Sequence, residues 1–177
     1  MKKQSTRPEL PKSETRRGFM KHAGAATAFM IVPRAVLGGE NYIAPSDRLN
    51  IAAVGAAGKG SSDIKSVAHE NIYAICDIDD RRLADTLQQD FAASFRDRTK
   101  TYRDYREMLD SEPEIDAVLI STPDHMHAPI AMHAIGMGKH VYVQKPLCHT
   151  VNECRMLARA AMANSVVTQM GNQGHAG

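Results

Sequence analysis

From Arg48 onward, short apolar runs alternate with segments of helical periodicity, and this alternation constrains the fold more than any other feature. Val118, Leu119 and Ile120 are consecutive apolar residues, as expected of a buried strand with both sheet faces covered. Strands are predicted at residues 49–54, 72–76, 100–102, 115–120, 140–143 and 166–170. Six strands separated by helices predict an α/β fold with a doubly wound parallel sheet and right-handed crossovers.

The helices between these strands are predicted from apolar residues spaced three or four positions apart. Five segments have this pattern: Ile64, Val67 and Ala68; Leu83, Leu87 and Phe91; residues 104–109; Ile130, Ala134 and Ile135; and residues 151–161. Gly136 and Gly138 are predicted to end the fourth helix, because glycine commonly terminates helices.

A glycine-rich turn follows the first predicted strand. Gly55, Ala57 and Gly60 align with the G-x-G-x-x-G pattern, and Gly58 follows the alanine that replaces the middle glycine. In this pattern the first glycine allows a tight turn, the second lets the backbone approach a pyrophosphate, and the third permits close helix–strand packing. The next helix would offer its N-terminal N–H groups to the phosphates. The turn predicts an NAD(P)-binding Rossmann domain over residues 40–177, with a ligand-free glycine turn as the alternative.

Asp77 stands at the end of the second predicted strand, 22 residues after Gly55. An acidic residue at this position hydrogen-bonds the adenosine ribose hydroxyls and repels a 2′-phosphate, which favours NAD over NADP. Arg81 and Arg82 follow closely and keep NADP possible. The alternative is that Asp77 caps the next helix.

The loop after the fourth predicted strand reads Ser-Thr-Pro-Asp-His-Met-His over residues 121–127. Loops at the carboxyl ends of such strands bind ligands, so Thr122, Pro123 and His125 are predicted to lie beside the cofactor. Asp124 could equally cap the next helix. His125 and His127 are two positions apart, a poor spacing for two metal ligands on a helix, and no metal is predicted.

Lys145 and Pro146 follow the fifth predicted strand. A lysine here would point at the nicotinamide end of the cofactor, where its ammonium could bind a substrate hydroxyl, stabilise a developing alkoxide or relay a proton. Pro146 fixes the direction of the chain after it. Lys145 is therefore the candidate catalytic residue, with a solvated surface lysine as the alternative.

Taken together, these motifs resemble the Gfo/Idh/MocA oxidoreductases, named for glucose–fructose oxidoreductase and inositol dehydrogenase. The resemblance runs from Arg48 to the end, and its carriers are residues 55–60, Asp77, residues 122–127, residues 138–141 and residues 144–147. It implies hydride transfer between a nicotinamide cofactor and a sugar or cyclitol, with Lys145 as the lysine of the family's Glu-Lys-Pro motif. Gln144 departs from the glutamate. The resemblance also implies that residues 172–175 lie near the cofactor or a domain junction.

The same resemblance implies a second α/β domain with an open antiparallel sheet, which would begin where this chain ends, at Gly177. The acid/base histidine of the family lies in that domain. We therefore expect this chain to bind cofactor with little or no turnover, either as part of an exported oxidoreductase or as a stand-alone dinucleotide-binding module. A homo-oligomer is possible.

The basic residues are concentrated at the N-terminus. Residues 1–39 hold eight Lys or Arg and two Asp or Glu, a net charge of +6, whereas residues 40–177 have a net charge of −4. The mildly acidic remainder does not indicate a nucleic-acid surface. Arg16 and Arg17 precede a ten-residue apolar stretch that is too short to span a bilayer. Residues 1–39 thus resemble a twin-arginine signal peptide for export to the periplasm, with a disordered basic tail as the alternative.

Three cysteines, Cys76, Cys148 and Cys154, have no C-x-x-C spacing and form an odd set. This spacing argues against a structural zinc site and against a disulfide-stapled fold. We expect three small, mostly buried thiols that behave as hydrophobic residues.

Overall fold

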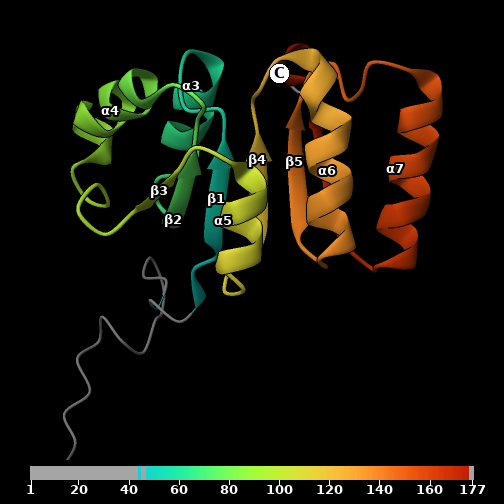
Figure 1. Ribbon diagram of the computed structural model, residues 1–177, viewed down its shortest axis with the longest axis horizontal. Helices are drawn as coiled ribbons and strands as arrows, with labels where there is room; N and C mark the ends of the chain where they lie inside the picture. The colour runs from blue at the N-terminus through green and yellow to red at the C-terminus, as the bar shows by residue number, and fades with distance from the viewer. Residues whose placement is uncertain (1–43, 45–46, 176–177) are drawn as a thin grey trace, which may run out of the picture. The chain divides into compact units, whose positions relative to one another are not determined.

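Six parallel strands form a single sheet in the spatial order β3-β2-β1-β4-β5-β6 (Figure 1). The computed structural model describes residue 44 and residues 47–175, which include all of these strands. Their bounds are β1 Asn50–Val54, β2 Asn71–Cys76, β3 Lys100–Tyr102, β4 Ala117–Ile120, β5 His140–Gln144 and β6 Thr168–Gly171. The predicted doubly wound parallel sheet is confirmed. The predicted leader at residues 1–39 lies outside the described residues.

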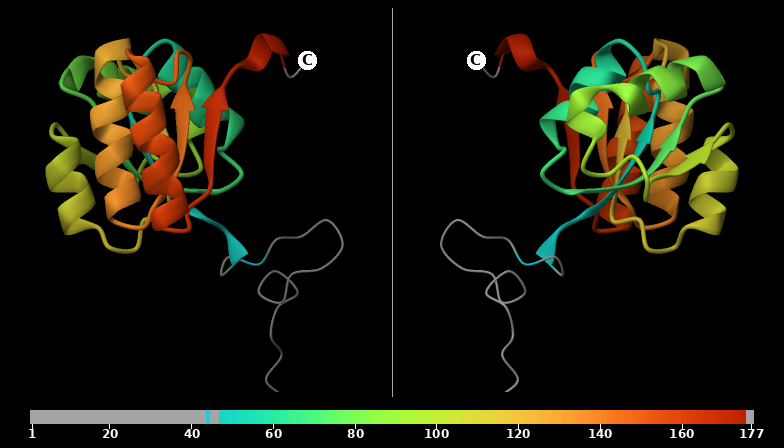
Figure 2. Two further views of the ribbon diagram at one scale, coloured as in Figure 1. Left: turned by 90° about the vertical axis from the view of Figure 1, so that its right-hand side faces the viewer. Right: turned by 90° about the vertical axis from the view of Figure 1, so that its left-hand side faces the viewer.

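Helices cover the sheet on both faces, and the alternation of side chains along the strands explains how (Figure 2). Ile51 and Ala53 of β1 pack with α3 and α4, whereas Ala52 and Val54 pack with α5, α6 and α7. The helix bounds are α3 Lys59–Ser66, α4 Asp80–Gln88, α5 Tyr105–Ser111, α6 His127–Gly136 and α7 Val151–Ala163. Within the described part of the chain, no helix is both long and apolar enough to cross a membrane.

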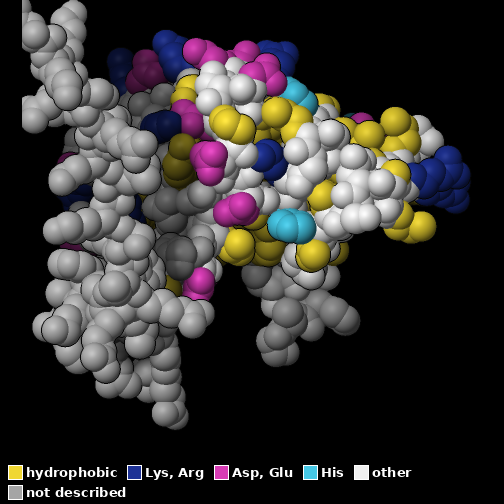
Figure 3. All heavy atoms as spheres, turned by 90° about the horizontal axis from the view of Figure 1, so that it is seen from below, with side chains coloured by type: hydrophobic (Ala, Val, Ile, Leu, Met, Phe, Trp, Pro, Cys, Tyr) yellow, Lys and Arg dark blue, Asp and Glu magenta, His cyan; other side chains and the backbone are white. Residues whose placement is uncertain are grey.

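The strand order places a topological switch point between β1 and β4. The chain proceeds from β1 to β3 in one direction, returns past β1, and continues from β4 to β6 in the other. Loops that leave β1 and β4 therefore separate at the carboxyl edge of the sheet, which is where ligands bind in such folds. At the opposite edge, where the strands begin, acidic and hydrophobic side chains are interspersed (Figure 3).

Two predicted helices end earlier than their apolar spacing suggested. α3 ends at Ser66, so Val67 is its C-cap and Ala68 lies in the following turn. α4 ends at Gln88 because Gln89 is extended, and Phe91 falls in the short 3-10 helix η2, Asp90–Ala92. Val67, Ala68 and Phe91 still pack against the apolar cluster on the α3 side of the sheet, which explains why the spacing continued past the helix ends.

The expectation of three free cysteines is wrong. Cys148 and Cys154 form a disulfide with a Cα–Cα distance of 5.9 Å, while Cys76 is free and buried. Thr150 is the N-cap of α7 and forms a capping box with Glu153, so Cys154 lies on the first turn of this helix, shortly after Cys148 in the chain. Burial raises the pKa of the Cys76 thiol to about 12.

Glu112, at the end of α5, ties this helix to the edge strand β3. Glu112 is 6% exposed, and its carboxylate accepts one hydrogen bond from Lys100 Nζ at 2.6 Å and another from the Tyr102 hydroxyl. These hydrogen bonds, the one from Lys100 first, lower the pKa of Glu112. Residues 103–106 directly follow β3, so the hydrogen bonds of Glu112 to Lys100 and Tyr102 also help to hold this loop at the carboxyl edge of the sheet.

Replacing Glu112 with glutamine is expected to lower the melting temperature at neutral pH by about 3–6 °C, since charged hydrogen bonds are lost. A carboxylate with a lowered pKa stabilises the fold above its unfolded pKa of about 4.3, and this contribution disappears as the pH falls through the lower folded value. The difference between variant and wild type should therefore shrink on acidification. Thermal melts at neutral and acidic pH measure it, with exposed Glu114→Gln as the control. An unchanged difference at acidic pH would contradict the assignment.

Candidate functional site

The glycine turn between β1 and α3 is built on two glycines that have no room for a side chain. Gly55 has φ +92°, and a Cβ there would lie 2.5 Å from the Ser121 carbonyl oxygen. A Cβ on Gly60 would lie 2.0 Å from the carbonyl oxygen of Gly55. The turn consequently lies directly against both the start of α3 and the loop after β4.

The outer side of the same turn is open. Gly58 has φ +58°, and a Cβ there would meet nothing within 4 Å. Gly58 is the N-cap of α3, and no side chain caps this helix. The Gly60 N–H donates to the Ala57 carbonyl oxygen at 3.0 Å. The uncapped start of α3 and the positive end of its dipole, with open space beside Gly58, are an arrangement suited to a phosphate.

Asp77 connects the end of β2 to the glycine turn. Its Oδ2 accepts a hydrogen bond from Ala56 N at 2.8 Å and its Oδ1 accepts one from Asp79 N at 3.0 Å. The N-cap of α4 is Asp79, which accepts from Arg81 N, so the alternative of Asp77 as a helix cap is wrong. Each carboxylate oxygen of Asp77 has a second lone pair, which leaves it able to accept ligand hydroxyls.

A cleft of about 410 Å³ lies at the switch point, between the ends of β1, β2 and β4. Six of the predicted cofactor residues line it: Gly55, Ala57, Asp77, Thr122, Pro123 and His125. Thr122 Oγ1 is buried without a hydrogen-bond partner. This orphaned hydroxyl, the open turn and the Asp77 carboxylate together fit a dinucleotide. Gly58 and Gly60 belong to the same turn but do not line the cleft.

Sequence reasoning missed one wall of this cleft. Ile78, which follows Asp77, lines it with a side chain that is 80% exposed. Arg103 lines it from the loop after β3, where it donates to the Ile78 carbonyl oxygen at 3.1 Å and pairs with Asp80 at 3.3 Å. The edge strand β3 was predicted, and extending the carboxyl-edge argument to its loop would have found Arg103.

Lys145 and Pro146 lie on the loop after β5 and are exposed; the peptide bond between them is cis. They do not line the cleft, but His127 connects their loop to it. His127 is 1% exposed, and its Nδ1 lies 2.6 Å from the Pro146 carbonyl oxygen while its Nε2 lies 2.8 Å from that of Thr122. In the sequence, His127 was considered as a metal ligand and as part of the motif at residues 122–127, and neither predicts this connection between the two loops. Residues 47–175 contain no cluster of three potential ligands for a metal ion.

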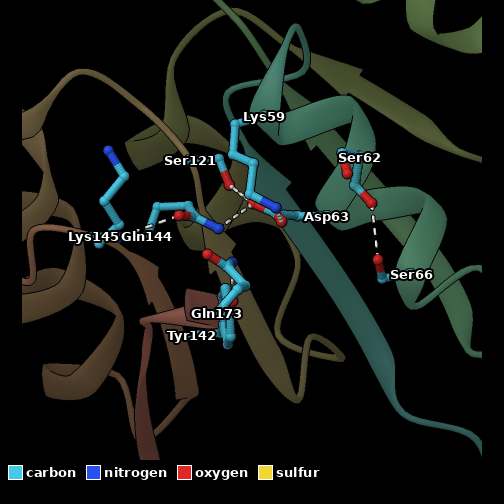
Figure 4. A network of polar contacts seen from close by, with 9 residues as sticks. All are labelled: Lys59, Ser62, Asp63, Ser66, Ser121, Tyr142, Gln144, Lys145 and Gln173. Carbon is cyan, nitrogen blue, oxygen red and sulfur yellow. Dashed lines mark hydrogen bonds and ion pairs between the residues drawn. The ribbon is translucent and has the colours of Figure 1, made fainter. Parts of the chain in front are cut away.

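A buried polar network lies behind the same two loops (Figure 4). Asp63 of α3 binds Lys59 at 2.8 Å, the Ser121 hydroxyl at 2.8 Å and the Gln144 amide at 2.7 Å. The hydrogen bond to Asp63 raises the pKa of Lys59. Lys145 stands next to Gln144, and its ammonium points away from Asp63 (Figure 4). No local sequence pattern singles out Asp63.

Comparison with known proteins gives a consistent result. Residues 49–172 match the Gfo/Idh/MocA family, described as an oxidoreductase family with an NAD-binding Rossmann fold. A glycosyl hydrolase family 109 protein from Shewanella baltica is 32% identical over 162 residues, covering 78% of this chain and 35% of that protein. The chain thus spans about a third of the length of the curated relatives it matches.

Solved structures agree with the family match. GenD2 from gentamicin A biosynthesis, in complex with NAD, is 27% identical with a TM-score of 0.63, covering 80% of this chain and 37% of that one. The myo-inositol 2-dehydrogenase from Lactobacillus plantarum is 25% identical with a TM-score of 0.61, covering 70% and 36%.

Proposed function

This chain belongs to the Gfo/Idh/MocA oxidoreductase family and carries its NAD-binding Rossmann fold, and from this premise we propose that it serves hydride transfer between NAD and a sugar or cyclitol. The observation that carries the proposal is the meeting of the glycine turn, through Gly55 and Ala57 just before the uncapped helix α3, and the Asp77 carboxylate at one cleft. These groups bind the two features shared by all nicotinamide dinucleotides, a pyrophosphate and an adenosine ribose.

Each part of the cleft suits one part of the cofactor. The N–H groups at the start of α3 would hold the pyrophosphate, and Asp77 would accept the ribose hydroxyls. The exposed Ile78 offers an apolar surface to the adenine. Thr122 and Pro123 would then border the nicotinamide, which supplies the hydride acceptor when bound. Arg82 also lines the cleft, which keeps NADP possible.

Lys145 is the residue proposed to act on the substrate. Its ammonium would donate a hydrogen bond to the substrate oxygen and stabilise negative charge that develops there. Its exposure and its connection through His127 to the Thr122 loop support this role. Because the chain spans about a third of the length of its curated relatives, we propose that a second domain with an acid/base histidine completes the site in the whole protein, and that these 177 residues bind cofactor without turnover. A stand-alone binding module is the alternative.

The substrate class rests on the relatives. A structural neighbour is a myo-inositol 2-dehydrogenase, which supports a cyclitol or sugar alcohol group. The curated relatives are named glycosyl hydrolase family 109 proteins, and this favours cleavage of a glycosidic bond as the second candidate. Net formation of NADH by the full protein would indicate dehydrogenation, whereas release of a glycoside's leaving group without net NADH would indicate cleavage.

Export and self-association also belong to this proposal. The Arg16-Arg17 pair and the apolar stretch after it support twin-arginine export to the periplasm. That route carries folded proteins, which suits a protein that captures its cofactor before export. Homo-oligomerisation stays a prediction.

The proposal is tested by titrating the 177-residue chain with NADH and following the nicotinamide fluorescence. We expect saturable binding that NAD and ADP-ribose compete away, and no NADH formation from myo-inositol by this chain. Circular dichroism on the same sample establishes that it is folded. A folded chain that binds no NADH would refute the proposal, and steady turnover would refute the requirement for a second domain.

A further inference from the structure

The Asp63 carboxylate is buried and joins three separate segments of the chain. It is 6% exposed and lies in α3, yet its Oδ2 accepts hydrogen bonds from Ser121 after β4 and from Gln144 at the end of β5 (Figure 4). Its Oδ1 binds Lys59. A buried charge is costly unless such partners satisfy it. The glycine-turn helix and both loops of the candidate site therefore share one anchoring group.

Asp63 determines which way the Gln144 amide faces. An ionised carboxylate only accepts hydrogen bonds, so the amide must turn its NH₂ toward Asp63. This leaves Gln144 Oε1 to accept the backbone N–H of Lys145 at 3.2 Å. Asp63 is thus linked by two hydrogen bonds to the backbone N–H of Lys145 through the oriented side chain of Gln144.

Packing holds Gln144 in this orientation from the other side. Gln144 is 4% exposed, and a Cβ added to Gly171 of β6 would lie 3.0 Å from its Nε2. An ionised glutamate at position 144 could not donate to Asp63, and it would place a second negative carboxylate 2.7 Å from the first. Asp63 and Gln144 are therefore a matched pair, one accepting and one donating.

We infer that Asp63 is a positioning residue that sets the backbone of Lys145 through Gln144, and so serves the nicotinamide end of the site. This inference rests on the proposed function. Asp63 is not among the residues that line the candidate cofactor cleft. The effect that passes through Gln144 should accordingly be confined to ligands that extend past the glycine turn to Lys145.

The test compares NADH with ADP-ribose, which lacks the nicotinamide, by calorimetric titration of the full chain. Gln144→Glu is expected to weaken NADH binding about tenfold while ADP-ribose binding changes by less than about twofold. Adding Asp63→Asn to that variant provides an amide that can donate to Glu at 144, and should return NADH affinity to within about threefold of wild type. Gln169→Glu, an exposed charge on β6, is the control and should neither weaken NADH binding nor respond to Asp63→Asn.

Gln144→Met, of similar length but without an amide, covers the case in which Gln144→Glu does not fold; it should show the same NADH-selective loss. Equal losses for NADH and ADP-ribose in a folded variant, or no recovery in the folded double variant, would overturn the inference. A wild-type chain that binds neither ligand would instead overturn the proposed function, on which the inference depends.

Discussion

Replacement of Gly60 with alanine is expected to abolish measurable NADH binding, with a loss of at least about 100-fold in affinity. The new methyl would lie 2.0 Å from the Gly55 carbonyl oxygen and 3.4 Å from Ser121 Cβ. The nearest atom is backbone, so relief requires α3 to move away from the turn, and the N–H groups at its start move with it. We expect the free energy of unfolding to fall by about 3 kcal/mol or more. NADH fluorescence and urea unfolding measure the two effects.

Gly136→Ala is the matched control. Gly136 is the last residue of α6, and a Cβ there would meet nothing within 4 Å. Alanine favours helix over glycine, so this variant should be as stable as wild type or more stable by about 0.5–1 kcal/mol, with unchanged NADH affinity. Wild-type NADH binding by Gly60→Ala would contradict the packing role of Gly60.

The sheet could be predicted because parallel strands that are covered on both faces must be short and apolar, and residues 118–120 show this directly. The alternation of helices with these strands could be predicted as well, because two parallel strands must be joined by a crossover connection, which is usually a helix. The same reasoning located Asp77 and the Thr122 loop, because residues that directly follow parallel strands meet at one edge. Lys145 was placed on the adjacent loop by the same argument, though it does not line the cleft.

The remaining features depend on contacts that leave no local pattern. Asp63 meets Ser121 and Gln144 across 58 and 81 residues of sequence. From sequence alone, an aspartate inside a helix is predicted to be exposed to solvent unless its distant partners are known. The Cys148–Cys154 disulfide, by contrast, is local, but it depends on where α7 begins, and spacing alone did not reveal that turn.

Replacement of Asp77 with asparagine is expected to reduce NADH affinity about tenfold and to remove most of the preference over NADPH. In the wild type the Asp77 carboxylate accepts hydrogen bonds from the backbone N–H groups of Ala56 and Asp79, and it would accept hydrogen bonds from the ribose hydroxyls as well. Asparagine has a single acceptor oxygen and cannot satisfy all of them. It also lacks the charge that repels a 2′-phosphate, while Arg82 stays in the cleft to attract one.

Asp85→Asn controls for the loss of a charge on the neighbouring helix α4. Asp85 is exposed and does not line the cleft, so cofactor affinity and selectivity should stay at wild-type values. Titrations with NADH and NADPH on both variants give the selectivity directly. If Asp77→Asn lowers stability but leaves the affinities for NADH and NADPH unchanged, the role of the carboxylate is only structural, through its hydrogen bond from the Ala56 N–H. If NADH affinity falls and NADPH affinity holds or rises, Asp77 binds the adenosine ribose hydroxyls. Its hydrogen bond from Ala56 N–H then positions the carboxylate for this contact in the absence of cofactor.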